Sequence, residues 1–199
     1  MAFIGIDLGT SGLRALLIDD NGQSIGSTSY NYPLSQPKTG WFEQNPADWI
    51  TALESAILEL SVKYPNFANV RGIGVTGHMH GATLLDEAGA VIRPCILWND
   101  TRSAKEALKL DQIDKVRQLS GNIVFSGFTA PKLAWLQKNE FSKAHFDNVK
   151  SPFALHSGGS SLRYKPPLNP AEACLKRPLL HRVWLQSTAI ALEKRRRKC

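Results

Sequence analysis

The first segment whose residue types suggest chemistry covers residues 7–12, Asp-Leu-Gly-Thr-Ser-Gly, between two short apolar runs. In a glycine-rich turn, backbone N–H groups can point at phosphate oxygens, and Thr10 and Ser11 add hydroxyl donors. Asp7, where the first apolar run ends, can hold a metal ion or its waters near a transferring phosphoryl group. The spacing fits neither a Walker loop nor a dinucleotide-binding turn. Turn chemistry alone equally fits a plain hairpin with Asp7 facing solvent.

A second candidate segment, residues 77–81, reads Gly-His-Met-His-Gly. Its histidines, His78 and His80, are two positions apart, as in some metal sites, but no carboxylate or cysteine lies at ligand spacing. Glycines on both sides let the backbone and an imidazole approach a small polar ligand closely. The same composition also fits a structural loop with one buried and one exposed histidine.

The third candidate is the trio Trp98, Asn99 and Asp100. An aromatic ring beside an amide and a carboxylate suits a sugar, whose apolar face packs on the ring while its hydroxyls need donors and acceptors. Taken singly, Asn99 or Asp100 is better explained as the N-cap of the helix that follows.

The elements that must position these residues alternate between strand and helix patterns. Asn45 and Pro46 are typical of a helix start, and apolar residues at helical spacing follow until Pro65. This order predicts an α/β domain with a mixed sheet. The strands are expected at 3–6, 13–18, 23–31 and 70–76, a hairpin at 82–85 and 91–97, and further helices at 102–110, 112–120 and 131–138.

Together the three candidate segments are far more specific than each alone. The sequences IGIDLGTSGLRALLID, TGHMHGATLLD, RPCILWNDTR and GFTAPKLAWL occur in the order and spacing of the FGGY carbohydrate kinases, over residues 3 to about 150. The chain resembles the xylulose kinase branch of that family most closely. The resemblance implies two ribonuclease H-like domains that close over ATP and a sugar. It places the general-base Asp in a second domain that this chain lacks.

The resemblance also implies a role for each candidate residue. Asp7 would assist catalysis at the Mg²⁺–phosphate centre, holding the metal indirectly, and Gly9, Thr10 and Ser11 would face the γ-phosphate of ATP. Met79 and His80 would contact the ketose, and Trp98, Asn99 and Asp100 would line the same pocket. The implied reaction converts D-xylulose to D-xylulose 5-phosphate, although this fragment is expected to be inactive alone. The alternative is a non-catalytic sugar-binding or interaction fragment.

Charge and composition divide the chain near residue 150. The net charge is +7, yet residues 151–199 hold 10 Lys/Arg and only 2 Asp/Glu, so residues 1–150 are close to neutral. We expect 1–150 to be an incomplete kinase-like N-terminal domain and 151–199 to be a divergent basic tail. That tail would be disordered, produced by a shifted reading frame, or a genuine alternative terminus. The basic run 194–198 could contact nucleic-acid phosphates, but a solvated end explains the same charges, so no nucleic-acid partner is expected.

Cysteine use and hydropathy indicate the compartment. Three scattered cysteines form no disulfide framework or zinc pattern, and the sequence contains no membrane-spanning run and no recognisable signal peptide. The expected location is therefore the cytoplasm, with a small-molecule sugar and ATP as partners and no membrane.

Overall fold

The computed structural model describes residues 1–86, 88–141, 151–153 and 160–163. Within these residues the chain forms two compact units. The first unit comprises Met1–Tyr32 and Trp49–Gly77 with the strand at Ser160–Arg163. The second comprises Pro33–Asp48 and residues 78–141 with the strand at Ser151–Phe153. Each unit is described by itself below.

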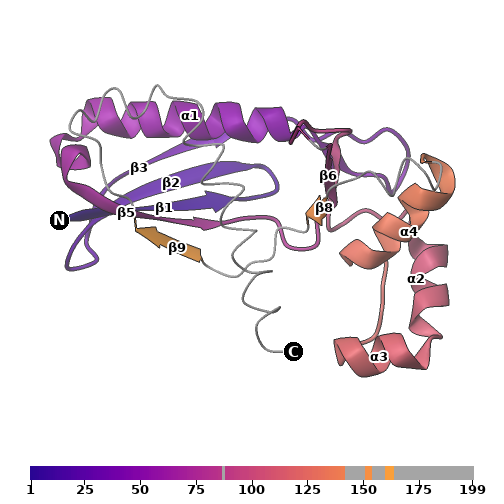
Figure 1. The fold of residues 1–199 in the computed structure, drawn as a ribbon. Helices are drawn as coiled ribbons and strands as arrows, with labels where there is room; N and C mark the ends of the chain where they lie inside the picture. The colour runs from indigo at the N-terminus through magenta and orange to yellow at the C-terminus, as the bar shows by residue number, and fades with distance from the viewer. Residues whose placement is uncertain (87, 142–150, 154–159, 164–199) are drawn as a thin grey trace. The chain divides into compact units, whose positions relative to one another are not determined.

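A five-stranded sheet forms the first unit. Its strands are β1 (Ala2–Leu8), β2 (Gly12–Asp19), β3 (Ser24–Asn31), β5 (Val70–Thr76) and β9 (Ser160–Arg163). They lie in the order β3-β2-β1-β5-β9 (Figure 1). β1 pairs antiparallel with β2 and parallel with β5, so the sheet is mixed, as predicted. A parallel pair needs a crossover connection, and the chain supplies it between β3 and β5.

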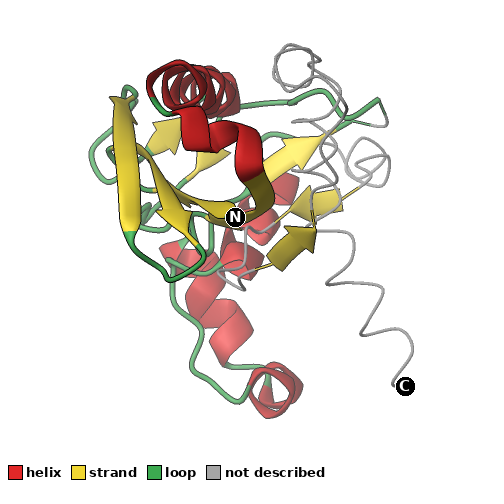
Figure 2. Ribbon diagram, turned by 90° about the vertical axis from the view of Figure 1, so that its left-hand side faces the viewer, coloured by secondary structure: helices red, strands yellow, loops and turns green. Residues whose placement is uncertain are grey.

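The crossover contains helix α1 (Pro46–Lys63), which lies along one face of the sheet (Figure 1), and Figure 2 shows it end-on over the strands. The predicted cap is confirmed: Asn45 Oδ1 accepts a hydrogen bond from the backbone N–H of Ala47 at 3.1 Å. A 3₁₀ helix, η1 (Pro65–Asn69), then leads into β5. The core between α1 and the sheet contains the predicted helix face and alternate strand residues: Trp49, Leu53, Ala56, Ile57 and Leu60 with Ile4, Ile6, Leu8, Leu13, Ala15 and Leu17.

The second unit combines short strands with three helices. β4 (Glu43–Gln44) pairs with β7 (Cys95–Ile96), and β6 (Thr83–Leu85) pairs with β8 (Ser151–Phe153). Helix α2 (Ala104–Asp111) lies against both α3 (Asp114–Ser120) and α4 (Thr129–Asn139). Its core cluster consists of Ala82, Leu84, Ile96 and Leu136.

Three predicted elements differ from the structure. The second arm of the predicted hairpin, 91–97, forms a strand only at Cys95–Ile96, after Pro94, which has no N–H for a ladder. Helix α4 begins at Thr129 rather than Pro131, because the first turn of a helix tolerates proline.

The third difference lies beyond residue 150. No strand was expected there, yet β8 and β9 pair with the backbones of β6 and β5, and an edge pairing of this kind needs no alternating sequence pattern. The rest of the predicted tail, including 194–198, lies outside the described residues. Within the described part of the chain, no helix is both long and apolar enough to span a bilayer.

Candidate functional site

Hydrogen bonds within the first unit hold the turn between β1 and β2. The backbone N–H of Gly9 donates to the carbonyl of Gly12 at 2.9 Å. The N–H of Tyr32 donates to the carbonyl of Ser11 at 3.4 Å, and the Tyr32 hydroxyl donates to the carbonyl of Gly9. Burial, and then the negative charge of Asp7, raise the pKa of Tyr32, so this hydroxyl keeps its proton. The turn therefore has a fixed shape.

Close backbone packing explains why glycine occupies both ends of this turn. A Cβ atom added to Gly12 would lie 2.7 Å from the carbonyl oxygen of Tyr30. One added to Gly9 would lie 3.1 Å from the carbonyl oxygen of Gly12. Between them, Thr10 is half-buried and Ser11 is exposed. The turn thus presents backbone and small hydroxyl groups, the composition that suits a phosphate.

Asp7 lies at the carboxyl end of β1, directly before the turn, with its side chain on the solvent-exposed face of the sheet. Mg²⁺ prefers one or two carboxylates together with waters and substrate phosphates over an all-protein cage. An exposed carboxylate beside a hydroxyl-bearing turn fits that preference. Among the described residues, no group of three or more His, Cys, Asp or Glu could hold a metal ion by itself.

The loop at 77–81, whose residues 78–81 belong to the second unit, has one buried and one partly exposed histidine. His78 is buried, Met79 is 50% exposed, and His80 is half-buried. His80 is the one non-glycine residue of the described chain with a positive φ, at 61°. Its ring lies 4.8 Å from that of Phe128, between centroids. The loop thus presents Met79 to solvent and fixes the His80 ring against an aromatic neighbour.

Lys132 connects this loop to helix α4, and the sequence analysis missed it. Its side chain is fully buried, and its Nζ donates to the carbonyl of His80 at 2.9 Å and to the carbonyl of Gly127 at 2.5 Å. Burial lowers the pKa of Lys132 to about 8. One signal was available: Lys132 lies four residues before the core residue Leu136, which is the spacing of the apolar face of a helix.

Trp98 and Asn99 have different environments. Trp98 is 48% exposed, whereas Asn99 is half-buried, and within the described residues its buried Oδ1 has no hydrogen-bond partner. Gly127 brings Phe125 close to them, because a Cβ there would lie 2.9 Å from both the Trp98 carbonyl oxygen and the Phe125 ring. The Phe125 ring is also 4.1 Å from that of Phe128, between centroids. Residue type alone did not single out Phe125 or Phe128.

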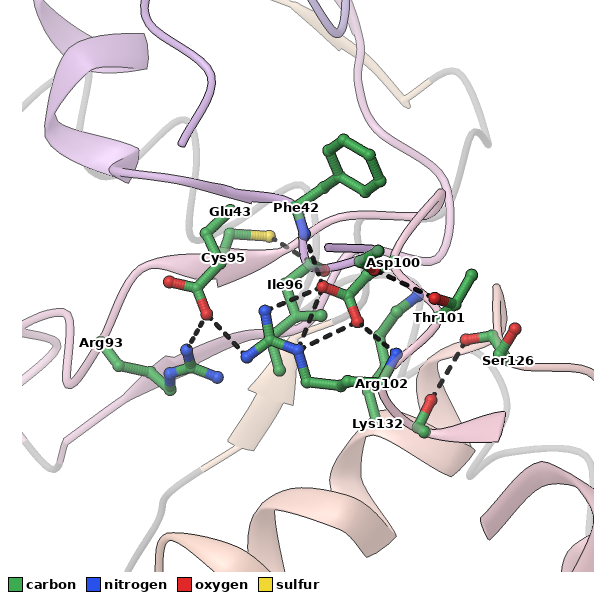
Figure 3. A network of polar contacts seen from close by, with 12 residues as sticks. Phe42, Glu43, Arg93, Cys95, Ile96, Asp100, Thr101, Arg102, Ser126 and Lys132 are labelled. Atoms are coloured by element: carbon green, nitrogen blue, oxygen red, sulfur yellow. Dashed lines mark hydrogen bonds and ion pairs between the residues drawn. The ribbon is translucent and has the colours of Figure 1, made fainter. Parts of the chain in front are cut away.

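Asp100, in contrast, lies in the interior with none of its surface exposed (Figure 3). Its carboxylate accepts hydrogen bonds from the backbone N–H of Phe42 at 2.6 Å and from that of Arg102 at 2.9 Å. The Arg102 guanidinium adds bonds of 2.9 Å from Nε to Oδ1 and 2.8 Å from Nη2 to Oδ2. Neither Asn99 nor Asp100 is the helix N-cap, which is Ser103.

Arg102 extends this buried network (Figure 3). Its Nη1 lies 2.7 Å from Glu43 Oε1, and the same carboxylate oxygen forms an ion pair with Arg93. The guanidinium carbon lies 4.0 Å from the ring centroid of Trp41 and 5.2 Å from that of Trp135, distances typical of cation–π contacts. Charges and aromatic rings therefore fix the segment that carries Trp98 and Asn99.

The structure thus assigns the predicted residues to both units. Asp7, Gly9, Thr10 and Ser11 belong to the first unit, and Met79, His80, Trp98, Asn99 and Asp100 belong to the second. Within the second unit, His80 and Trp98 are connected through contacts with Phe125, Gly127 and Phe128.

Comparison with known proteins identifies relatives of this chain. The model of the FGGY family of carbohydrate kinases, N-terminal domain, matches residues 2–154. The chain is 45% identical over 139 residues to a xylulose kinase of Klebsiella pneumoniae, covering 69% of this chain and 29% of the relative. It is 41% identical over 139 residues to a xylulose kinase of Escherichia coli strain K12, which covers 69% of this chain and 28% of that relative.

A solved structure shows the same fold. The crystal structure of xylulose kinase from Rhodospirillum rubrum matches with a TM-score of 0.71 and 30% identity, covering 77% of this chain and 32% of that one. This match confirms the predicted sugar-kinase fold. The chain spans about three tenths of the length of the curated relatives it matches. A family model that covers both the turn at 7–12 and the loop at 77–81 shows that the chain belongs to the FGGY family of carbohydrate kinases.

Proposed function

We propose that this chain supplies the N-terminal part of a kinase that transfers the γ-phosphoryl group of ATP to the 5-hydroxyl of D-xylulose. The observation that carries the proposal is the 45% identity to a curated xylulose kinase, within a family match that includes both candidate site segments. The geometry supports it on two sides: a closed phosphate-type turn beside an exposed carboxylate, and an aromatic surface beside an unpaired amide oxygen.

The phosphate side belongs to the first unit. The turn formed by Gly9, Thr10 and Ser11 would donate backbone and hydroxyl hydrogen bonds to phosphate oxygens. Asp7 would hold Mg²⁺, directly or through its waters, and the ion would supply charge neutralisation at the phosphates. The hydrogen bonds from Tyr32 to Gly9 and Ser11 keep the turn in shape before any ligand binds.

The sugar side belongs to the second unit. Met79 and the Trp98 ring offer apolar surface, while His80 and Asn99 offer polar groups for hydroxyls. The buried Oδ1 of Asn99, which has no hydrogen-bond partner among the described residues, would accept a hydrogen bond from a sugar hydroxyl. For Asp100 we propose a positioning role, because its carboxylate is enclosed and hydrogen-bonded by Arg102 and Phe42.

In the proposed reaction, the oxygen of the 5-hydroxyl attacks the γ-phosphorus in line and the bond to the β,γ-bridging oxygen breaks. ADP leaves, and the hydroxyl proton passes to a general base. We assign that base to no residue of this chain, which spans three tenths of its curated relatives. The residues assigned here bind and orient the two substrates.

Methionine NMR tests the sugar assignment, because the chain contains only two methionines, Met1 and Met79. In the 199-residue chain labelled with ¹³C-methyl methionine, D-xylulose is expected to shift the Met79 methyl resonance and to leave that of Met1 unchanged. Glycerol, added at the same concentrations, serves as the comparison ligand. His80→Ala is expected to weaken the response to D-xylulose, whereas Asp7→Asn is expected to leave it intact.

Equal responses of Met79 to glycerol and D-xylulose, or no response to either, would contradict the sugar assignment. The phosphotransferase assignment needs a second measurement. Residues 1–141 are fused to the part of the Klebsiella pneumoniae kinase that follows its matched segment, and D-xylulose-dependent ADP formation is followed. A folded fusion that binds both substrates without turnover would favour a sugar-binding role instead.

A further inference from the structure

His80 has a backbone conformation that side chains other than glycine rarely adopt. Its φ of 61° lies in the left-handed region, where the Cβ of an L-residue crowds the following carbonyl. Such a conformation persists only where surrounding contacts hold it. The neighbouring Gly81 has no Cβ, and one added there would lie 3.1 Å from the Cys95 sulfur, so the loop is closely packed on β7.

Lys132 supplies a contact of the required kind. Its Nζ donates to the carbonyl oxygen of His80 itself, at 2.9 Å, and to that of Gly127 at 2.5 Å. An ammonium gives stronger hydrogen bonds to carbonyls than a neutral donor does. The lysine is anchored in the first turn of α4, so the His80 carbonyl is bound to a rigid element.

Pairing with a neighbouring negative charge does not explain why Lys132 is buried. Cys95 on β7 is buried, and burial raises the pKa of its thiol to about 11, so it is neutral at pH 7. The Asp100 carboxylate is already paired with Arg102, whose positive charge opposes that of Lys132. The hydrogen bonds described for the Lys132 ammonium go to the carbonyl oxygens of His80 and Gly127. These contacts indicate that the buried lysine stabilises the backbone conformation at the two residues that it binds.

We propose that Lys132 is a positioning residue, which holds the left-handed backbone of His80 and thereby presents Met79 and His80 to the ketose. The ketose part of this inference rests on the function proposed above. The backbone part does not, since it concerns contacts within the second unit alone.

The first test compares Lys132→Leu with Lys138→Leu in the ¹³C-methyl-labelled chain, without sugar. Both substitutions remove a lysine of α4 and add no methionine, but Lys138 has a side chain that is 62% exposed and is 3.7 Å from Glu106. The Met79 methyl resonance is expected to shift or broaden in Lys132→Leu and to keep its position in Lys138→Leu. Unchanged Met79 spectra in both folded variants would overturn the proposal.

A second measurement uses the natural protein, in case Lys132→Leu does not fold. Because the pKa of Lys132 is lowered to about 8, its ammonium loses a proton at a pH where ordinary lysines stay charged. The Met79 methyl is expected to show a transition centred near pH 8, which Lys138→Leu retains. Burial raises the pKa of Cys95 to about 11, so its titration does not account for a transition near pH 8. A flat Met79 signal from pH 7 to 9.5 would contradict the proposal.

A double-mutant cycle tests the connection to His80. Glycine adopts a positive φ without strain, so His80→Gly removes the need for a holding contact. The decrease in urea midpoint caused by Lys132→Leu is therefore expected to be smaller in the His80→Gly background than in the natural sequence. Equal decreases in both backgrounds would show that Lys132 acts independently of the His80 backbone.

Titration with D-xylulose separates the two proposals. If both hold, Lys132→Leu weakens D-xylulose binding about tenfold or more, since hydrogen bonds from a charged group are lost. If the natural chain binds no D-xylulose but the spectral shift, the pH transition and the coupling are observed, the proposed function fails and the backbone role of Lys132 stands. If D-xylulose binds the natural chain and Lys132→Leu equally well, the positioning role fails and the proposed function stands.

Discussion

Replacing Asp100 by Asn tests whether the buried ion pair holds the second unit together. The substitution keeps the size of the side chain and removes its charge. Asp100 and Arg102 both have fully buried side chains, and the carboxylate accepts hydrogen bonds from the guanidinium and from two backbone N–H groups. In Asp100→Asn, the amide NH₂ would face the guanidinium, donor against donor. Among the described carboxylates, the buried positive charge of Arg102 would keep Glu43, 2.7 Å from its Nη1.

The expected loss follows from general values for buried pairs. Removing one partner of a buried ion pair costs about 3–5 kcal/mol. Since Glu43 still neutralises part of the Arg102 charge, we expect Asp100→Asn to lie near the lower end, about 3 kcal/mol. For a chain of this size, that decrease corresponds to a Tm lower by about 6–12 °C. Because domains are stable by only about 5–15 kcal/mol, the variant is expected to fold but to melt early.

The assay is urea and thermal unfolding followed by circular dichroism. Asp20→Asn is the matched control: its side chain is 54% exposed and lies 3.7 Å from the N-terminal amine, and exposed pairs contribute about 0–1 kcal/mol. The double variant Asp100→Asn/Arg102→Met is expected to lose less than the sum of the two single losses, since no buried charge is left alone. A loss for Asp100→Asn no larger than that for Asp20→Asn would refute the reasoning.

Three further outcomes are expected. Gly12→Ala is expected to lower the free energy of unfolding by about 1–3 kcal/mol, because its Cβ would lie 2.7 Å from a backbone oxygen of β3. Gly5→Ala is the neutral control in the same urea titration, because its Cβ would have no neighbouring atom within 4 Å. Hydrogen bonds from Lys63, and then from Thr28 and Tyr30, lower the pKa of Glu59 from its usual 4.5 to about 2. The stability that this carboxylate contributes is therefore present above pH 4.5 and is lost as the pH falls toward 2. Glu59→Gln is expected to flatten the pH dependence of Tm in that range, and an unchanged slope would contradict the assignment. In the fused kinase, His80→Ala is expected to raise the KM for D-xylulose more than the KM for ATP, and equal increases would make His80 structural.

The sequence predicted the elements that have a local signature. The strands at 2–8 and 12–19 alternate buried and exposed residues, and the helix at Pro46–Lys63 has its cap at Asn45. Each of these signals is contained within a few consecutive residues, so a pattern can reveal it. The tight turn at 7–12 belongs to the same class, because its glycines indicate a turn between two strands, while its phosphate-binding role stays a prediction.

Such patterns could not predict the tertiary contacts that stabilise the second unit. β4 has two residues and pairs with β7, which lies more than fifty positions later in the chain. Arg102 packs against both Trp41 and Trp135, which are far apart in the sequence. No periodicity connects these positions, since the contacts depend on tertiary packing. Residue type suggested a ligand contact for Asp100. In the structure, its buried carboxylate accepts hydrogen bonds from Arg102 and from the backbone of Phe42.

The segment around Trp98 shows why residues proposed to contact a ligand and the residues that hold them are recognised by different evidence. Trp98 is exposed, whereas Asp100, two positions later, is enclosed, so one short stretch faces both solvent and interior. A surface that binds a sugar loses less conformational entropy when its backbone is already fixed. For the proposed sugar surface, Asp100 binds the backbone of Phe42, and Lys132 binds that of His80. A chain that kept Met79 and Trp98 but lost these two buried charges would keep the chemistry of the site without its geometry. It is therefore expected to bind sugar weakly despite an intact contact set.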